Sequence, residues 1–252
     1  MVNRYFLYLS YDGSAFHGWQ LQDNAPTVQQ FINEGLSALL KQEINVVGCG
    51  RTDAGVHARN FYAHFNLKVE LSDLEQADII FKLNRFLPKE IAIRNLQQVR
   101  PDAHARFDPV SRTYKYFIHR KKDPFLENRS YYLYGLIDIE LMNEATKVMM
   151  QFTDFTSFSK LHTQTKTNDC KISQAIWEEK EHQLIFTITA DRFLRNMVRA
   201  IVGTLLEVGR HKISLDEFKN VIESRNRSEA GYSVPAKALF LEDVEYPKEI
   251  WI

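Results

Sequence analysis

The sequence predicts an α+β protein made of two ferredoxin-like halves, each a split β-α-β unit. The order strand, helix, strand, strand, helix, strand is expected over the first hundred residues and again over the rest of the chain. No Pro- or Ser-rich linker divides the two halves, and the stretch 101–109 is the only candidate for a connection between them. We therefore expect halves at 1–104 and 105–252, joined into one mainly antiparallel sheet flanked by helices, with a central cleft suited to an active site.

The first half opens with a strand over 3–11, where apolar and polar side chains alternate before the Asp12-Gly13 turn. A helix should follow from Thr27, which with Gln30 has the spacing of a capping box ahead of an apolar three- and four-residue repeat. The other elements expected in this half are strands over 44–49, 59–65 and 91–99, and a helix that begins at Ser72 with Glu75 closing its box.

The second half repeats this order, although the two halves do not share residues. The expected strands cover 112–120, 171–179, 183–190 and 237–245, and the expected helices cover 137–152, 192–209 and 214–224. The extra helix before the last strand is the only departure from the order of the first half.

Composition describes a soluble globular protein of 252 residues, with 44% hydrophobic and 25% charged residues. The 32 basic and 32 acidic residues cancel, but basic residues gather in 100–122 and 192–212, which gives a neutral chain a positive face. The sequence indicates neither a membrane span nor a signal peptide. We expect Cys49 and Cys170 to be reduced thiols in a cytoplasmic protein.

The stretch GCGRTDAGVHA, residues 48–58, crowds Gly48, Gly50 and Gly55 around Asp53. Glycines let a backbone turn sharply and approach a ligand closely, so Asp53 is the first candidate for a chemical role. A structural role, in which the Asp53 side chain caps a turn, explains the pattern equally simply. A phosphate cradle is disfavoured because the chain has no GxxxxGK[ST] and no GxGxxG opening a helix, and a metal site is disfavoured because it has no HExxH and no CxxC.

The expected helix at 192–209 places Arg192, Arg195 and Arg199 on one stripe, beside the small Gly203. A guanidinium on a largely apolar helix requires a partner, and a carboxylate is the natural one. Arginines that extend to water are the alternative.

The strand 112–120 has Tyr114 and Tyr116 on one side and Lys115 and Phe117 on the other. Such an arrangement is compatible with a platform on which bases stack. Alternating tyrosines are also common in the core of a sheet, so this pattern alone does not decide the point.

Taken together, these segments resemble the tRNA pseudouridine synthase A family. The similar blocks are YDGSAFHGWQLQ at 11–22, TVQ at 27–29, GRTDAGVHA at 50–58, HARF at 104–107, TYKY at 113–116, DFTSF at 154–158 and FLRNMVRAIVG at 193–203. They span nearly the whole chain in the order found in the family.

The resemblance implies that Asp53 is the catalytic aspartate, that Tyr114 lies beside the target base, that Arg199 pairs with the aspartate and that Arg51 helps to displace the base. It implies substrate contacts by Ala103, His104, Ala105, Arg106 and Phe107, and more loosely by His162, Thr163, Gln164, Thr165 and Lys166. The implied reaction isomerises uridine to pseudouridine at positions 38, 39 and 40 of the tRNA anticodon arm, by a homodimer without metal or cofactor.

Three positions depart from the family pattern: Cys49, Arg195 and Ala238 stand where Ala or Ser, His, and Gly are usual. None of the three is the expected nucleophile. Two other functions stay open: a non-catalytic RNA-binding module with Asp53 as a turn residue, and a phosphate hydrolase with an aspartate nucleophile. The second is disfavoured because no metal-binding carboxylate lies close to Asp53 in the sequence.

Overall fold

The computed structural model describes residues 2–160 and 167–252. The chain forms two compact units, the first made of Met1–Val110 and Leu241–Ile252 and the second of Ser111–Phe240. The sequence places the boundary between the halves at 104 and 105, within the stretch 101–109, whereas the first unit of the structure continues to Val110. The C-terminal segment Leu241–Ile252 also belongs to the first unit. The α+β fold class predicted from the sequence is confirmed.

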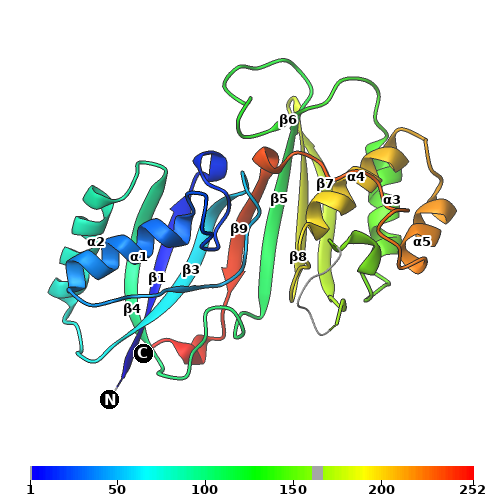
Figure 1. Cartoon of the computed structure of the whole chain (residues 1–252). Coiled ribbons are helices and arrows are strands. Elements are labelled where there is room, and N and C mark those ends of the chain that lie inside the picture. The colour runs from blue at the N-terminus through cyan, green and yellow to red at the C-terminus, as the bar shows by residue number, and fades with distance from the viewer. Residues whose placement is uncertain (1, 161–166) are drawn as a thin grey trace. The chain divides into compact units, whose positions relative to one another are not determined.

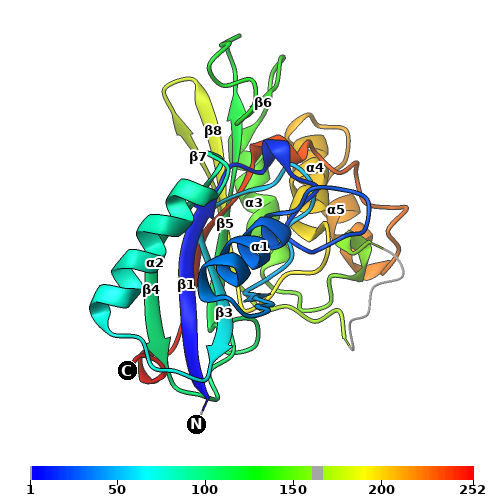
Figure 2. The same ribbon diagram turned by 60° about the vertical axis from the view of Figure 1, so that its left-hand side comes forward.

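The first unit is an antiparallel sheet with the strand order β4-β1-β3-β2, the order of a ferredoxin-like unit. Its elements are β1 (Asn3–Tyr11), α1 (Val28–Leu40), β2 (Val47–Gly48), β3 (His57–Leu67), α2 (Asp73–Phe86) and β4 (Ile91–Val99), with short 3₁₀ turns at Gly13–Ala15 and Lys248–Ile250. Both helices cover one face of the sheet (Figure 1), and Figure 2 shows β4, β1 and β3 side by side.

Alternation along β1 decides which side chains face the helices. Tyr5, Leu7 and Leu9 are completely buried, and the Tyr5 hydroxyl accepts a hydrogen bond from the Leu71 N–H, just before α2. This side of the strand is therefore the side that the helices cover. Each buried leucine contributes about 1.5–3 kcal/mol to the burial free energy.

The predicted caps explain where the two helices begin. The Thr27 side chain accepts from the Gln30 N–H, but the Gln30 amide donates to Glu34 instead of returning to the cap. The box of Ser72 and Glu75 is complete, with each side chain bonded to the other residue's backbone N–H. The sequence therefore located the start of both helices, but the capping box expected at Thr27 and Gln30 is not formed, whereas that of Ser72 and Glu75 is.

The second unit has the antiparallel strand order β5-β8-β7, and the short β6 pairs with β5 in parallel. Its elements are β5 (Ser111–His119), β6 (Tyr131–Tyr132), α3 (Ile139–Met149), β7 (Ile172–Lys180), β8 (Gln183–Ala190), α4 (Met197–Gly209) and α5 (Leu215–Glu223), with 3₁₀ turns at Thr156–Phe158 and Ala236–Ala238. Strand β9 (Leu239–Glu245) begins in this unit, where Phe240 meets Phe117 edge to face, with ring centroids 5.2 Å apart.

Two sequence-based expectations about elements were wrong. Helix α4 begins at Met197 instead of Arg192, because Asn196 adopts the left-handed conformation (φ 68°) and cannot continue a helix. Arg192 and Arg195 therefore precede the helix, and the stripe of three arginines does not exist. The strand expected over 44–49 shortens to Val47–Gly48.

Cys49 and Cys170 are both buried free thiols, and burial raises the pKa of Cys170 to about 12. Across the described part of the chain, no helix combines the length and the apolar character that a membrane crossing requires.

Candidate active site

The loop that carries Asp53 links β2 to β3 in the first unit. It leaves β2 with the Cys49 N–H bonded to the Tyr62 carbonyl at 2.7 Å, and it re-enters β3 through a turn in which the Val56 N–H donates to the Asp53 carbonyl at 3.1 Å. Gly55, inside this turn, has φ +79°, a conformation that side chains disfavour. A main-chain hydrogen bond therefore closes the turn. Asp53 is the first residue of this turn and is half-buried.

The segment 11–22 holds this loop from the other side. The Trp19 N–H donates to the Thr52 carbonyl and the Gly55 N–H donates to the Phe16 carbonyl, both at 3.3 Å. The Thr52 hydroxyl also lies 2.9 Å from the Tyr11 hydroxyl in a buried contact. Residues on both sides of Asp53 are thus fixed, which explains why two blocks far apart in the sequence occur together.

Arg51 is exposed, and its Nε donates to the Gln20 amide oxygen at 3.1 Å. The Gln20 amide donates in turn to Gln29, whose own amide donates to the Val46 carbonyl at 2.8 Å. This chain of amides connects Arg51 to the start of α1. It gives the QLQ and TVQ blocks a structural role: they hold the loop arginine in place.

The three loop glycines have different reasons to be glycine. Gly55 has a positive φ, and a Cβ on Gly48 would lie 2.5 Å from the Trp19 indole. Gly50 has nothing within 4 Å of the position of a Cβ. Close packing therefore requires glycine at position 48, backbone conformation favours it at position 55, and neither reason applies at position 50.

The segment 103–107 also belongs to the first unit. Ala103 and Ala105 are completely buried, and their carbonyls accept hydrogen bonds from Arg4 and from the Tyr246 hydroxyl. The exposed part of the segment is Arg106 with Phe107, whose ring centre lies 5.7 Å from the guanidinium. His104 is partly buried, and its pKa is lowered, chiefly by that burial.

Tyr114 lies on β5 in the second unit, opposite Ile188 of β8. It is half-buried, and its ring meets Phe193 edge to face with centroids 5.1 Å apart. Tyr116, on the same side of the strand, is completely buried and donates to the Pro235 carbonyl at 3.0 Å. One tyrosine of the alternating pair is therefore core, and the other is accessible.

Arg199 is held at the start of α4. Its Nε donates to the Val234 carbonyl at 2.7 Å, and the Val234 N–H donates back to the Arg199 carbonyl at 3.3 Å. One turn further along, a Cβ on Gly203 would lie 1.8 Å from the Tyr232 carbonyl oxygen, so this face of α4 packs directly on the backbone of 231–234.

Two residues that the sequence did not single out hold the same segment. Arg227 donates to the carbonyls of Ala230 and Gly231, and the Asn196 amide donates to the Ser233 hydroxyl at 2.6 Å. No local pattern indicates the contact between Asn196 and Ser233, because these two residues are 37 positions apart. The segment 230–234 is thereby clamped beside Arg199.

Arg51 and Asp53 therefore share one loop of the first unit, while Tyr114 and Arg199 belong to the second. Because Asp53 and Arg199 lie in different units, their pairing stays a prediction. The expected substrate contacts at 162–166 lie outside the described residues. Within residues 2–160 and 167–252, no three His, Cys, Asp or Glu side chains gather in a way that could hold a metal ion.

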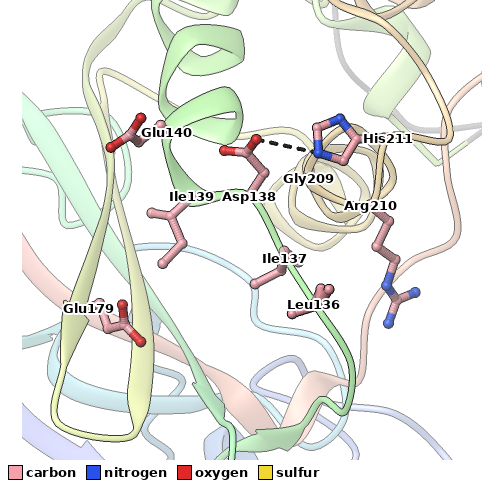
Figure 3. Close-up of a pocket in the computed structure, with 9 residues that line it drawn as sticks. All are labelled: Leu136, Ile137, Asp138, Ile139, Glu140, Glu179, Gly209, Arg210 and His211. Atoms are coloured by element: carbon pink, nitrogen blue, oxygen red, sulfur yellow. Dashed lines mark ion pairs between the residues drawn. The ribbon is translucent and has the colours of Figure 1, made fainter.

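A cavity of about 830 Å³ in the second unit contains none of the expected site residues. It is bordered by the start of α3 and the end of α4, where Asp138 and the exposed His211 form an ion pair at 3.4 Å (Figure 3). Asp138 also caps α3 by accepting from the Leu141 N–H at 2.9 Å. These contacts give Asp138 a structural role.

Comparison with known proteins agrees with these features. The tRNA pseudouridine synthase family profile matches residues 8–108 and 152–247. The chain is 55% identical to tRNA pseudouridine synthase A of Parabacteroides distasonis over 99% of this chain and 98% of that one. It is 52% identical to the Bacteroides fragilis protein and 50% identical to the Porphyromonas gingivalis protein of the same name, each over 99% of both chains.

The α+β fold and the matched segments define an enzyme of the class that modifies RNA. The chain belongs to the tRNA pseudouridine synthase family.

Proposed function

We propose that this protein isomerises uridine to pseudouridine at positions 38, 39 and 40 of the tRNA anticodon arm, with Asp53 as the nucleophile. As a member of its family it is an isomerase that acts on tRNA. The observation that supports Asp53 is its position at the start of a turn whose neighbours are hydrogen-bonded to the segment 11–22. The main chain that carries this carboxylate is therefore held in place, which favours the precise positioning that a catalytic group requires.

The reaction breaks the bond between ribose C1′ and N1 of uracil and forms a bond between C1′ and C5. The proton on C5 leaves and N1 gains one, so composition and oxidation state do not change, and we expect neither cofactor nor metal. Ionised Asp53 has three routes: attack on C1′, addition to C6, or removal of a ribose proton to give a glycal. Each route needs a charged carboxylate.

The remaining residues have assigned roles in this proposal. Arg199 would pair with Asp53 and favour its ionised form. Tyr114 would stack on the uracil near C5, where a proton must leave. The target base must leave its stack at a cost of a few kcal/mol, and Arg51 would fill the space it vacates. Among residues 103–107, exposed Arg106 and Phe107 are suited to contact RNA directly.

The test is to map pseudouridine by carbodiimide labelling and mass spectrometry in unmodified tRNA treated with the purified protein. Asp53→Asn should lower the rate by about 10⁴-fold or more while tRNA binding persists. Asp78→Asn, at an exposed carboxylate on α2, is the matched control and should be fully active. Activity in Asp53→Asn would refute the nucleophile, and pseudouridine only outside positions 38–40 would refute the substrate site.

Binding of tRNA without any pseudouridine would support the alternative of a non-catalytic RNA-binding module. We also propose that the protein acts in the cytoplasm as a homodimer. Sedimentation equilibrium should then give twice the chain mass of 29.5 kDa, whereas a single-chain mass at micromolar concentration would contradict it.

A further inference from the structure

A cavity of about 140 Å³ opens on the sheet of the first unit, apart from the Asp53 loop. Its walls are four aromatic and two amide side chains, called here the aromatic–amide cavity: Phe6, Tyr8, Tyr62, Asn95, Gln97 and Trp251. All six belong to the first unit. At about 30 Å³ per water molecule, the cavity has room for four or five waters. This volume is suited to one planar ring.

Strand register brings these side chains together. Phe6 stands opposite Gln97, and Tyr8 stands opposite Asn95 on one side and Tyr62 on the other. Because Tyr5 and Leu7 face the helices, Phe6 and Tyr8 face away from them. The cavity therefore lies on the face of the sheet that α1 and α2 do not cover.

The aromatic walls present ring faces. The Tyr8 and Tyr62 rings are stacked, with centroids 4.9 Å apart and an interplanar angle of 22°, and the Trp251 ring lies 6.1 Å from that of Tyr62. Phe6 is 1% exposed and forms the floor, whereas the other three rings are partly exposed. A flat ligand can therefore reach the rings from solvent.

The amide walls supply hydrogen bonds. In the part of the chain that the structure describes, the Gln97 side chain makes no hydrogen bond, and the Asn95 amide is bonded only through its oxygen, which accepts from the Leu96 N–H. A carboxamide offers a donor and an acceptor, as base edges do. At the rim, the exposed Arg94 guanidinium lies 5.6 Å from the centre of the Tyr8 ring and can reach a phosphate.

We propose that the aromatic–amide cavity binds one unstacked nucleobase of the tRNA substrate, away from the base that reacts. The ring stacks on the exposed aromatic faces, Gln97 and Asn95 bond to its edge, and Arg94 contacts the adjoining phosphate. An aromatic-bearing sheet of this topology is the surface on which RNA-recognition motifs stack bases. An apolar side chain from a protein would leave both amides without partners, so a base is favoured over a second copy of this chain.

This inference rests on tRNA being the substrate, and its first test is affinity. Tyr8→Leu should raise the Kd for tRNA about tenfold, and Gln97→Leu several-fold, because one base stack is worth about 1–3 kcal/mol. The increase should appear in KM, because the reacting base binds elsewhere. Gln98→Leu is the matched control: Gln98 stands opposite Tyr5 on the other side of β4 and should bind tRNA like the wild type.

The second test uses Trp251 as a reporter, since the other two tryptophans, Trp19 and Trp177, are only 1% and 2% exposed. Single-stranded tetranucleotides should quench the fluorescence of the wild type, and Trp251→Phe should lose that quenching. Unchanged Kd in both Tyr8→Leu and Gln97→Leu, or no quenching, overturns the proposal.

Two further results separate the possibilities. Variants that sediment as smaller species but bind tRNA normally would assign this face to a second copy and overturn the proposal. If the wild type makes no pseudouridine at positions 38–40 while the variants still lose tRNA affinity, the cavity stands and the proposed function fails.

Discussion

Replacing Gly18 with alanine should disturb the candidate active site without changing any residue that has a proposed role in the reaction. Gly18 has φ +92°, and an added Cβ would lie 2.4 Å from the Thr52 carbonyl oxygen and 3.2 Å from the Asp53 carbonyl carbon. Gly18 is therefore the point at which the segment 11–22 presses on the backbone of the Asp53 loop.

The structure sets the size of the effect. A side chain at positive φ costs about 1–2 kcal/mol. Real Cβ contacts essentially never fall below 3.0 Å, so the Thr52 carbonyl must retreat by at least 0.6 Å, the difference between 3.0 and 2.4 Å. Asp53 would move with it, and a displacement near 1 Å lowers a catalytic rate by about 10²-fold. Gly18→Ala should therefore lose about 1–3 kcal/mol of stability and about 10- to 100-fold in kcat.

Two assays check this prediction: urea denaturation for the free energy of unfolding, and tritium release from tRNA labelled at uridine C5 for the rate. Gly50→Ala is the control for stability, because nothing lies within 4 Å of its Cβ position, and it should change the unfolding free energy by no more than about 0.5 kcal/mol. Wild-type stability and rate in Gly18→Ala, or an equal loss of stability in Gly50→Ala, would refute the reasoning.

Three further predictions follow from single contacts. Ser72→Ala removes the complete capping box of α2 and should lower the unfolding free energy by about 1 kcal/mol in denaturant titration; the same change at exposed Ser228 should have no effect. Burial, and secondarily Arg4, lowers the pKa of His64 to about 3 from an unfolded value of 6.5, so protonation favours unfolding. Stability should be full above pH 6.5 and fall by up to about 1.4 kcal/mol per unit toward pH 3, and His64→Gln should flatten that slope in a pH series of denaturation curves. Arg199→Lys keeps the charge but loses the Nε bond to Val234, so stability should fall by about 1 kcal/mol and tritium release should slow; unchanged values would contradict the clamp.

Elements with local signals were predictable from the sequence. Strand β4 covers 91–99 as expected from its alternation, and α2 begins at the capping box of Ser72. In each case the deciding interactions join residues within a few positions of one another, so a short window contains them. The motif around Asp53 was also visible, because its glycines are concentrated in one stretch.

Elements decided by distant contacts were not predictable. The apolar repeat of α4 extends back to Leu194, but the helix begins only at Met197. The Asn196 amide bonds to Ser233, 37 residues away, and the left-handed conformation of Asn196 prevents the helix from beginning earlier. The aromatic–amide cavity depends on the register of three strands and on Trp251 near the end of the chain. Neither arrangement leaves a trace in a local window.

The Asp53 loop combines both kinds of information. Its turn is local, since Gly55 supplies the positive φ that the hydrogen bond from Val56 to Asp53 requires. A single turn is too weak to fix a carboxylate in water, because ordering each residue costs about 1–2 kcal/mol. The fixing contacts come from the main chain of Trp19 and Phe16, thirty or more residues earlier. Since those contacts are backbone to backbone, the segment 11–22 can hold the loop only at close approach, and this requires glycine where a Cβ would intervene. Gly18, Gly48 and Gly55 therefore shape the site by permitting this close packing, although they contribute no chemistry.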